Sequence, residues 1–337
     1  METLMNVLIR TDIGSHHGMG HAVRMLALAR ELQRRGASVT FVTATDALRN
    51  YVVPFRCDIG VGPQAVTTPS QRGDILIVDT KADDWANDNS GLWLARDAGL
   101  RVVRIDYPYA TPESCDLLIG PCAHWDTATV TRLRTSFGTR FLYGWEYVLL
   151  EPLMTLMPPV TQEQTVTESI VFTAGGSDPT HALQRMYDFT ASFLSTKQLI
   201  FLVGSQAEML DTRSGTKRLS PTLVVSFDRV WLRSTELVVT LFGVTSYEAL
   251  WWEVPQVIFA HTEENKRGAR QFAAQMPEMA ICRGDIHRDT PERAQQTLKE
   301  MLEQGPYVPR PAAFDGLGVQ RVAQAICELA TSSTCTQ

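Results

Sequence analysis

The stretch NVLIRTDIGSHHGMGHAVRMLALARELQRRG, residues 6–36, contains the pattern that decides the fold. Its first residues are apolar and β-branched and predict a strand, and a loop rich in glycine and histidine follows. From about His21 the apolar residues recur at helical spacing until Gly36, which is suited to close a helix. A strand, a glycine loop and a helix in this order predict the first unit of a parallel α/β sheet.

The same alternation of strand and helix patterns continues along the chain. Continuously apolar runs suit strands that are covered on both faces, as in parallel sheets. In the first half the further strand candidates are SVTFVTA (38–44), ILIVDT (75–80), RVVRIDY (101–107) and DLLIGP (116–121). In the second half they are SIVFTAGG (169–176), LIFLVG (199–204), LVVSF (223–227), LVVTLFG (237–243) and PQVIFAH (255–261), with helices predicted over 180–194, 245–252 and 265–275.

The 337 residues are enough for two domains at roughly 150 residues each. The proline-containing, polar stretch 153–168 interrupts the pattern and predicts a linker. We therefore expect an N-terminal Rossmann-like lobe over 1–152 and a C-terminal lobe over 169–315. A final helix and tail over 316–337 is expected to pack back on the first lobe. In such sheets ligands bind beyond the carboxyl ends of the strands, so a cleft between the lobes is the expected site.

Composition places the chain among ordinary globular proteins, with 44% hydrophobic and 20% charged residues. The net charge of −6 is spread over interspersed signs and indicates neither a nucleic-acid nor a membrane partner. No apolar run is long enough to span a bilayer and the N-terminus has no signal pattern, so a cytoplasmic location is expected. The six cysteines form no C-x-x-C pair, which favours reduced thiols over a disulfide or zinc framework.

Three glycine turns predict a site for an anion. The first, around Gly18 and Gly20, precedes the helix that begins near His21. The second contains Gly175, Gly176 and Ser177, with Pro179 at the expected first helical position. In the third, Gly243 ends a strand, Thr245 and Ser246 can cap the next helix, and Glu248 faces the same loop. Backbone N–H groups at such helix starts favour phosphate.

Two other interpretations of these turns stay open. Every α/β connection needs a turn, so the glycines can be scaffold alone. A Rossmann dinucleotide site is less well supported, because GSHHGMG lacks the G-x-G-x-x-G spacing and no acidic residue clearly ends the second strand. A diphosphate held by two turns fits the pattern better.

The histidines allow several roles. His16, His17 and His21 are close in sequence but lack a carboxylate or cysteine at ligand spacing, so no metal and no cofactor are predicted. His21 can be a structural residue of its loop. Alternatively, a helix N-terminus keeps its imidazole neutral, so that it can act as a general base toward water or a hydroxyl.

Several motifs together resemble a known family. The opening has Arg10, Asp12, Gly18, Gly20, His21 and Arg24 in an Arg-x-Asp, Gly-x-Gly-His, Arg pattern before the helix LALA. The segments YGWEYVLLEP (143–152), TAGGSDPT (173–180), VTSYEALWWEVPQVIFAHTEENKRGARQFA (244–273) and FDGLGVQRVAQAI (314–326) follow in the family's order. They resemble the nucleotide-sugar hydrolases of the pseudaminic acid pathway and their spore-coat polysaccharide relatives.

The resemblance implies a GT-B fold, with two Rossmann-like lobes. It further implies that His21 activates water against the anomeric carbon of a UDP-linked amino sugar. Cleavage of the C–O bond would invert that carbon without a metal. Gly18 and Gly20 would shape the loop of the base, and Asp12 would be one of the substrate- or nucleotide-binding residues. Gly175, Gly176, Ser177 and Gly243 would form the turns of the nucleotide lobe. Thr245 and Ser246 would contact the diphosphate, Glu248 the ribose, and Asn265 the sugar side.

The sequence also departs from the family at positions that concern the sugar. Lys266 replaces the Gln of an Asn-Gln pair, Glu151 an Arg, and Lys81 a Tyr, while Tyr107 replaces a second Asp. Gly243–Val244 replaces a Gly-Ser in the third turn. These changes predict a retained nucleotide site with an altered sugar.

Three functions are compatible with the sequence. The first is the hydrolase; the second is a glycosyltransferase with a hydroxyl acceptor; the third is a nucleotide-sugar-binding protein without catalysis. Trp251 and Trp252 could stack on a base but are expected to lie in the core. Arg24 could reach a phosphate but is expected to pair with Asp12. Arg34–Arg35 are expected to form a solvated helix end.

Overall fold

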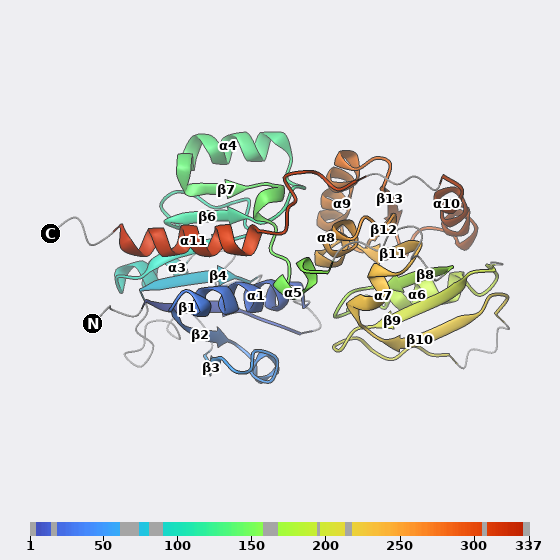
Figure 1. Ribbon diagram of the computed structural model, residues 1–337, viewed down its shortest axis with the longest axis horizontal. Coiled ribbons are helices and arrows are strands. Elements are labelled where there is room, and N and C mark those ends of the chain that lie inside the picture. The colour runs from blue at the N-terminus through green and yellow to red at the C-terminus, as the bar shows by residue number, and fades with distance from the viewer. Residues whose placement is uncertain are drawn as a thin grey trace. The chain divides into compact units, whose positions relative to one another are not determined.

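The computed structural model describes residues 5–14, 19–60, 74–80, 90–157, 168–193, 196–212, 218–304 and 309–332. The chain divides into two compact units (Figure 1). The first contains the described residues of 1–17, 21–154 and 312–337, and the second those of 18–20 and 155–311. The change from the first unit to the second at 154/155 falls within the stretch expected to be a linker, of which residues 158–167 lie outside the described part.

The first unit is built on a parallel sheet of seven strands in the order β3-β2-β1-β4-β5-β6-β7. The strands are β1 (Asn6–Thr11), β2 (Ser38–Thr43), β3 (Arg56–Ile59), β4 (Ile75–Asp79), β5 (Arg101–Ile105), β6 (Leu117–Gly120) and β7 (Phe141–Tyr143). The helices are α1 (Gly20–Arg34), α3 (Ser90–Asp97), α4 (Thr127–Phe137), α5 (Pro152–Thr155) and α11 (Gly318–Thr331), with short 3-10 turns at Asp46–Leu48, Gly138–Arg140 and Trp145–Tyr147. All five strands predicted for this half are present.

The second unit repeats this architecture with six parallel strands in the order β10-β9-β8-β11-β12-β13. They are β8 (Ser169–Thr173), β9 (Gln198–Val203), β10 (Thr222–Ser226), β11 (Leu237–Leu241), β12 (Gln256–Ala260) and β13 (Ala280–Asp285). The helices are α6 (Ala182–Phe189), α7 (Arg229–Arg233), α8 (Val244–Trp251), α9 (Glu263–Gln275) and α10 (Pro291–Gln304). The predicted α/β class with two Rossmann-like lobes of parallel strands is confirmed.

Burial explains why the central strands were readable from sequence. Every residue of β4, β8, β11 and β12 is buried, so their apolar runs are continuous. The strands that the sequence did not predict, β3, β7 and β13, all lie at the edge of a sheet. An edge strand has one neighbour and tolerates polar residues, as in the sequence RCDI of β3.

The C-terminal helix α11, red in Figure 1, belongs to the first unit. Arg321 of α11 donates a hydrogen bond to the carbonyl of Glu146, and Arg35 hydrogen-bonds the side chain of Gln324. At the start of α11, Gly318 lies so close to Val148 that a Cβ atom there would be 2.1 Å from the Val148 carbonyl oxygen. The chain therefore returns to the first unit after completing the second. None of the helices in the described part of the chain is both long and apolar enough to span a bilayer.

Candidate active site

His21 is the second residue of α1 and faces the carboxyl end of β4. Its Nδ1 lies 2.6 Å from Oδ1 of Asp79, the last residue of β4. The His21 side chain is 16% exposed and that of Asp79 only 1%. A strand end and a helix start thus bring together two residues that are 58 positions apart.

The ionisation of Asp79 decides which nitrogen of His21 carries a proton. Burial alone would raise the pKa of Asp79, but the charge of Arg24 and the hydrogen bonds from Arg24 and His21 outweigh burial and hold this pKa well below its usual value. An ionised carboxylate 2.6 Å from an unprotonated nitrogen would oppose two lone pairs, so Nδ1 carries a proton and donates a hydrogen bond to Asp79. Arg24 Nη2, 3.1 Å from the same nitrogen, then makes no hydrogen bond to it. Of the two ring nitrogens, Nε2 is therefore the one that is left to accept a proton.

Arg24, one turn after His21 on α1, joins two carboxylates. Its Nε and Nη2 each donate to Asp79 at 2.6 Å, and its Nη1 donates to Asp106 at 2.9 Å. Burial opposes the charged guanidinium, but Asp79 and Asp106 raise the pKa of Arg24 further above its usual value. The predicted pairing of Arg24 with Asp12 is wrong, because the strand ends of β4 and β5 reach this face of α1 and that of β1 does not.

Asp12 follows β1 and is buried by its own set of partners. Its Oδ1 accepts hydrogen bonds from Arg10 at 2.6 Å, from the Thr43 hydroxyl and from the Ala44 amide, and its Oδ2 accepts one from Thr80 at 2.7 Å. Burial would raise the pKa of Asp12, but Arg10 and the hydrogen bonds lower it. The carboxylate thus ties the ends of β1, β2 and β4 together.

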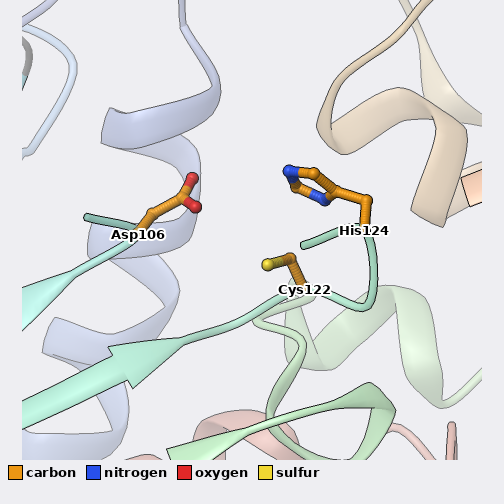
Figure 2. Close-up of side chains that lie close together, drawn as sticks. All are labelled: Asp106, Cys122 and His124. Atoms are coloured by element: carbon orange, nitrogen blue, oxygen red, sulfur yellow. The ribbon is translucent and has the colours of Figure 1, made fainter. Parts of the chain in front are cut away.

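A second group of polar side chains lies at the ends of β5 and β6. Asp106, Cys122 and His124 each place one potential ligand atom within 4.8 Å of the other two, and Figure 2 shows the three groups pointing toward one another. Asp106 has a left-handed backbone with φ of 57°, which aspartate tolerates better than most residues. Burial and the charge of Asp106 raise the pKa of the Cys122 thiol well above its usual value.

In the second unit, α8 begins directly after Gly243. Thr245, Ser246 and Glu248 are all buried in its first turns. Oε1 of Glu248 accepts a hydrogen bond from Nε of Arg229 at 2.6 Å, so the second carboxylate oxygen is the one available to another donor. The structure therefore brings the predicted residues of the third turn to one helix start. The prediction that Thr245 and Ser246 cap the helix is wrong, because α8 begins at Val244 after Gly243 and no described side chain caps it.

The buried oxygen atoms without a hydrogen-bond partner among the described residues include two that bear on the predicted site. One is Oγ of Ser246 and the other is Oδ1 of Asn265, whose Nδ2 donates to the carbonyl of Phe242 at 2.8 Å. Phe242 directly precedes Gly243, so Asn265 is anchored beside the third turn. A buried polar atom without a partner costs free energy, about 1–3 kcal/mol, and a ligand that supplies the partner recovers it.

The second glycine turn differs from its predicted form. Helix α6 begins at Ala182, not at Pro179, and both carboxylate oxygens of Asp178 accept hydrogen bonds from the amides of Ala182 and Leu183 at 2.8 Å. A carboxylate of the chain itself thus occupies the amides that were expected to bind an anion. Gly175 (φ 85°), Gly176 and Ser177 form the turn before it.

The other sequence-based expectations have mixed outcomes. Trp251 and Trp252 are buried in the core as expected. Arg34 is exposed and hydrogen-bonds Glu31, but Arg35 also contacts α11, so the pair is not simply a solvated helix end. The five cysteines of the described part are free thiols. Gly18, His16, His17 and Lys81 lie outside the described residues.

Sequence reasoning missed Asp79 and Asp106 as parts of the site. Both end an apolar strand, in ILIVD and RVVRID, and parallel strands place their carboxyl ends at one edge of the sheet. That signal was present. The sequence carried no signal, however, for the residue of α1 with which each carboxylate pairs.

Comparisons with known proteins place the fold. No model of a protein family and no curated protein matches the chain. Among solved structures, the calicheamicin glycosyltransferase CalG4 has a TM-score of 0.65 at 14% identity, covering 99% of this chain and 100% of that chain. MnaA of S. aureus, in a co-structure with UDP, has 0.64 at 11%, covering 97% of each chain. The UDP-GlcNAc 2-epimerase from Methanocaldococcus jannaschii has 0.62 at 11%, covering 96% and 100%.

At these identities the likeness concerns the fold, which is GT-B with two Rossmann-like lobes. The similar structures described above include a glycosyltransferase and an epimerase. The finer resemblance to the hydrolases of the pseudaminic acid pathway thus stays a prediction.

Proposed function

We propose that this chain is an enzyme that cleaves a nucleotide sugar at its anomeric carbon, with His21 as the general base and water as the acceptor. The observation that carries the proposal is the contact between His21 Nδ1 and Asp79 Oδ1 at 2.6 Å. A carboxylate that holds one imidazole nitrogen fixes the tautomer and leaves the other nitrogen to accept a proton, as in catalytic histidine–aspartate pairs.

The proposed chemistry is a single displacement. Nε2 of His21 takes a proton from a water molecule while the water oxygen forms a bond to the anomeric carbon. The bond between that carbon and the diphosphate oxygen breaks, and the nucleoside diphosphate leaves with the bonding electrons. The positive charge that develops on His21 is stabilised by the ionised Asp79. A positioned base of this kind contributes roughly 10²–10⁴-fold to the rate.

The proposal assigns nucleotide binding to the second unit. The amides at the start of α8 and the hydroxyls of Thr245 and Ser246 would bind the diphosphate, and Glu248 would accept hydrogen bonds from the ribose. The Asn265 oxygen would bind the sugar side. Gly175, Gly176 and Ser177 would contribute their turn, although Asp178 caps α6 and reduces what that helix start can offer. The uncapped start of α8 is thus the main anion site of this proposal.

A glycosyltransferase is the second candidate, because transferases are among the structures similar to this chain. The same base would then take the proton of a sugar or lipid hydroxyl in place of water. The sequence around His21 resembles that of the hydrolase family, which favours water as the acceptor. The chemistry at the anomeric carbon is the same in both.

A panel of nucleotide sugars in ¹⁸O-labelled water tests the proposal, with phosphorus NMR and mass spectrometry of both products. We expect the label in the released sugar. Label in the phosphate would reject attack at carbon and with it this mechanism. Turnover that requires an added alcohol would establish the transferase instead.

A binding protein without catalysis predicts a different result. His21→Ala would then leave any turnover in the preparation unchanged. Our proposal predicts a rate lower by at least ~10²-fold, with nucleotide affinity nearly unchanged.

A further inference from the structure

We propose that Asp106, Cys122 and His124 form a binding site for a thiophilic divalent cation of the Zn²⁺ class. None of the three ligands is the base His21, but Asp106 is joined through Arg24 to Asp79, the partner of that base. The three potential ligand atoms all lie within 4.8 Å of one another (Figure 2). For any three atoms this close, some point lies within about 2.8 Å of all of them. Zinc bonds to sulfur, nitrogen and oxygen are about 2.0–2.3 Å long, so shifts of roughly half an ångström would complete the site.

The chemistry of the donors selects the ion. A thiolate with an imidazole and one carboxylate suits Zn²⁺ or Co²⁺, whereas Mg²⁺ and Ca²⁺ prefer sites made of oxygen alone. Cys122 is 2% exposed, while the Asp106 side chain is 23% exposed and His124 is half-buried. The sulfur ligand is therefore buried in the protein, and the carboxylate and imidazole side of the site is accessible to solvent. Three protein ligands with one solvent position is a known arrangement for zinc.

The charges around the site also balance. When the ion binds, the Cys122 thiol releases its proton to solvent and a sulfur–metal bond forms. The thiolate and the Asp106 carboxylate then neutralise the two positive charges of the ion. Arg24 donates to Oδ2 of Asp106 at 2.9 Å and orients the carboxylate, as partners of metal ligands commonly do.

The positions of the ligands explain why the sequence did not predict this site. Cys122 and His124 follow β6 with one residue between them, and Asp106 follows β5. The two strands are paired in parallel, so their carboxyl ends lie at the same edge of the sheet. The short sequence PCAH contains only two of the ligands, and the pairing of β5 with β6 supplies the third.

Titration of the full-length, metal-free protein with Co²⁺ tests the proposal in a buffer without thiols or chelators. We expect one equivalent of Co²⁺ to produce thiolate-to-cobalt charge-transfer absorption in the near ultraviolet, and Zn²⁺ to displace it. Cys122→Ala should abolish this absorption. Cys115→Ala, which removes another buried thiol of the same unit, should retain it.

A second variant covers the case in which Cys122→Ala does not fold. His124→Gln alters a half-buried side chain and should lower the affinity for Co²⁺ at least tenfold. The proposal is overturned by the absence of a thiolate band in the unmodified protein, by a band that persists in Cys122→Ala, or by equal loss in Cys115→Ala. Unchanged affinity in His124→Gln would also overturn it. All of these readouts are independent of enzymatic activity.

Discussion

Asp79 accepts a hydrogen bond from Nδ1 of His21 at 2.6 Å, and the same carboxylate accepts two hydrogen bonds from Arg24. The buried carboxylate is therefore held by a charge that does not titrate in the working pH range, while the histidine that it orients remains partly exposed. This arrangement separates the two tasks of the site. Arg24 holds the Asp79 carboxylate in place, and Asp79 in turn orients the imidazole ring of His21.

Asp79→Asn should lower kcat much more than it changes KM. An asparagine side chain can present its NH₂ group to Nδ1, which favours the tautomer with the proton on Nε2 and removes the acceptor that the reaction needs. We expect kcat to fall by roughly 10²–10⁴-fold, in steady-state assays across a range of pH. A variant that changes KM alone would show that Asp79 does not act through His21.

The ion pairs of Asp79 should also make the stability of the folded protein depend on pH in the acidic range. The pKa of Asp79 is lower in the folded protein than in the unfolded chain. Ionised Asp79 therefore stabilises the fold fully above its usual pKa of 3.8, and this stabilisation is lost as the pH falls from 3.8 toward the pKa of the folded state. Melting temperatures measured from pH 7 down to pH 3 should therefore fall more steeply for the unmodified protein than for Asp79→Asn. At pH 7 the variant should be less stable by about 3–5 kcal/mol, since it leaves Arg24 buried and poorly paired. Parallel pH curves would contradict this assignment.

Ser246→Ala should weaken nucleotide binding without lowering the stability of the fold. The Ser246 hydroxyl is buried without a partner in the described structure, so its removal should leave the melting temperature unchanged or raise it. If the hydroxyl binds a diphosphate, UDP affinity should fall roughly tenfold or more in calorimetric titrations. A lower melting temperature with an unchanged Kd would make Ser246 a scaffold residue.

Glu248→Gln should reduce discrimination between a ribose and a deoxyribose. One carboxylate oxygen is engaged by Arg229, and the proposed role of the other is to accept from the ribose hydroxyls. We expect the unmodified protein to bind UDP more tightly than 2′-deoxy-UDP, and the variant to lose most of that preference. Glu236→Gln provides a matched control, because Glu236 pairs with Lys197 in the same unit. An equal preference in all three proteins would contradict the role of Glu248.

Gly318→Ala should destabilise the first unit. The added Cβ would meet the backbone of Val148 at 2.1 Å, and backbone cannot rotate away as a side chain can. We expect a loss of about 1–3 kcal/mol, measured by denaturant unfolding and by faster hydrogen exchange in α11. Gly243→Ala is the control for stability, because its Cβ would meet nothing within 4 Å and its φ of 171° is an extended conformation open to any residue. Similar losses of stability in both variants would show that the close approach of Gly318 to Val148 is not the cause.

The sequence by itself determined the α/β class, the five strands predicted in each half, and the glycine that precedes α8. Of the predicted strands, only β10 lies at the edge of a sheet. These features depend on local pattern: continuous apolarity marks a strand covered on both faces, and a glycine between a strand pattern and a helix pattern marks a helix start. The edge strands β3, β7 and β13 were not recognised, since an edge position does not require a continuous apolar run.

Only the tertiary structure decided which polar residues act together. Arg24 pairs with Asp79 and Asp106 in place of Asp12 because β4 and β5 lie next to each other in the sheet. Asp178 caps α6 because that helix begins three residues later than its proline suggested. Partners that are 55 and 82 positions apart leave no periodic trace in the chain, since their meeting depends on strand order and register. Local pattern determined the elements, and their packing determined the site.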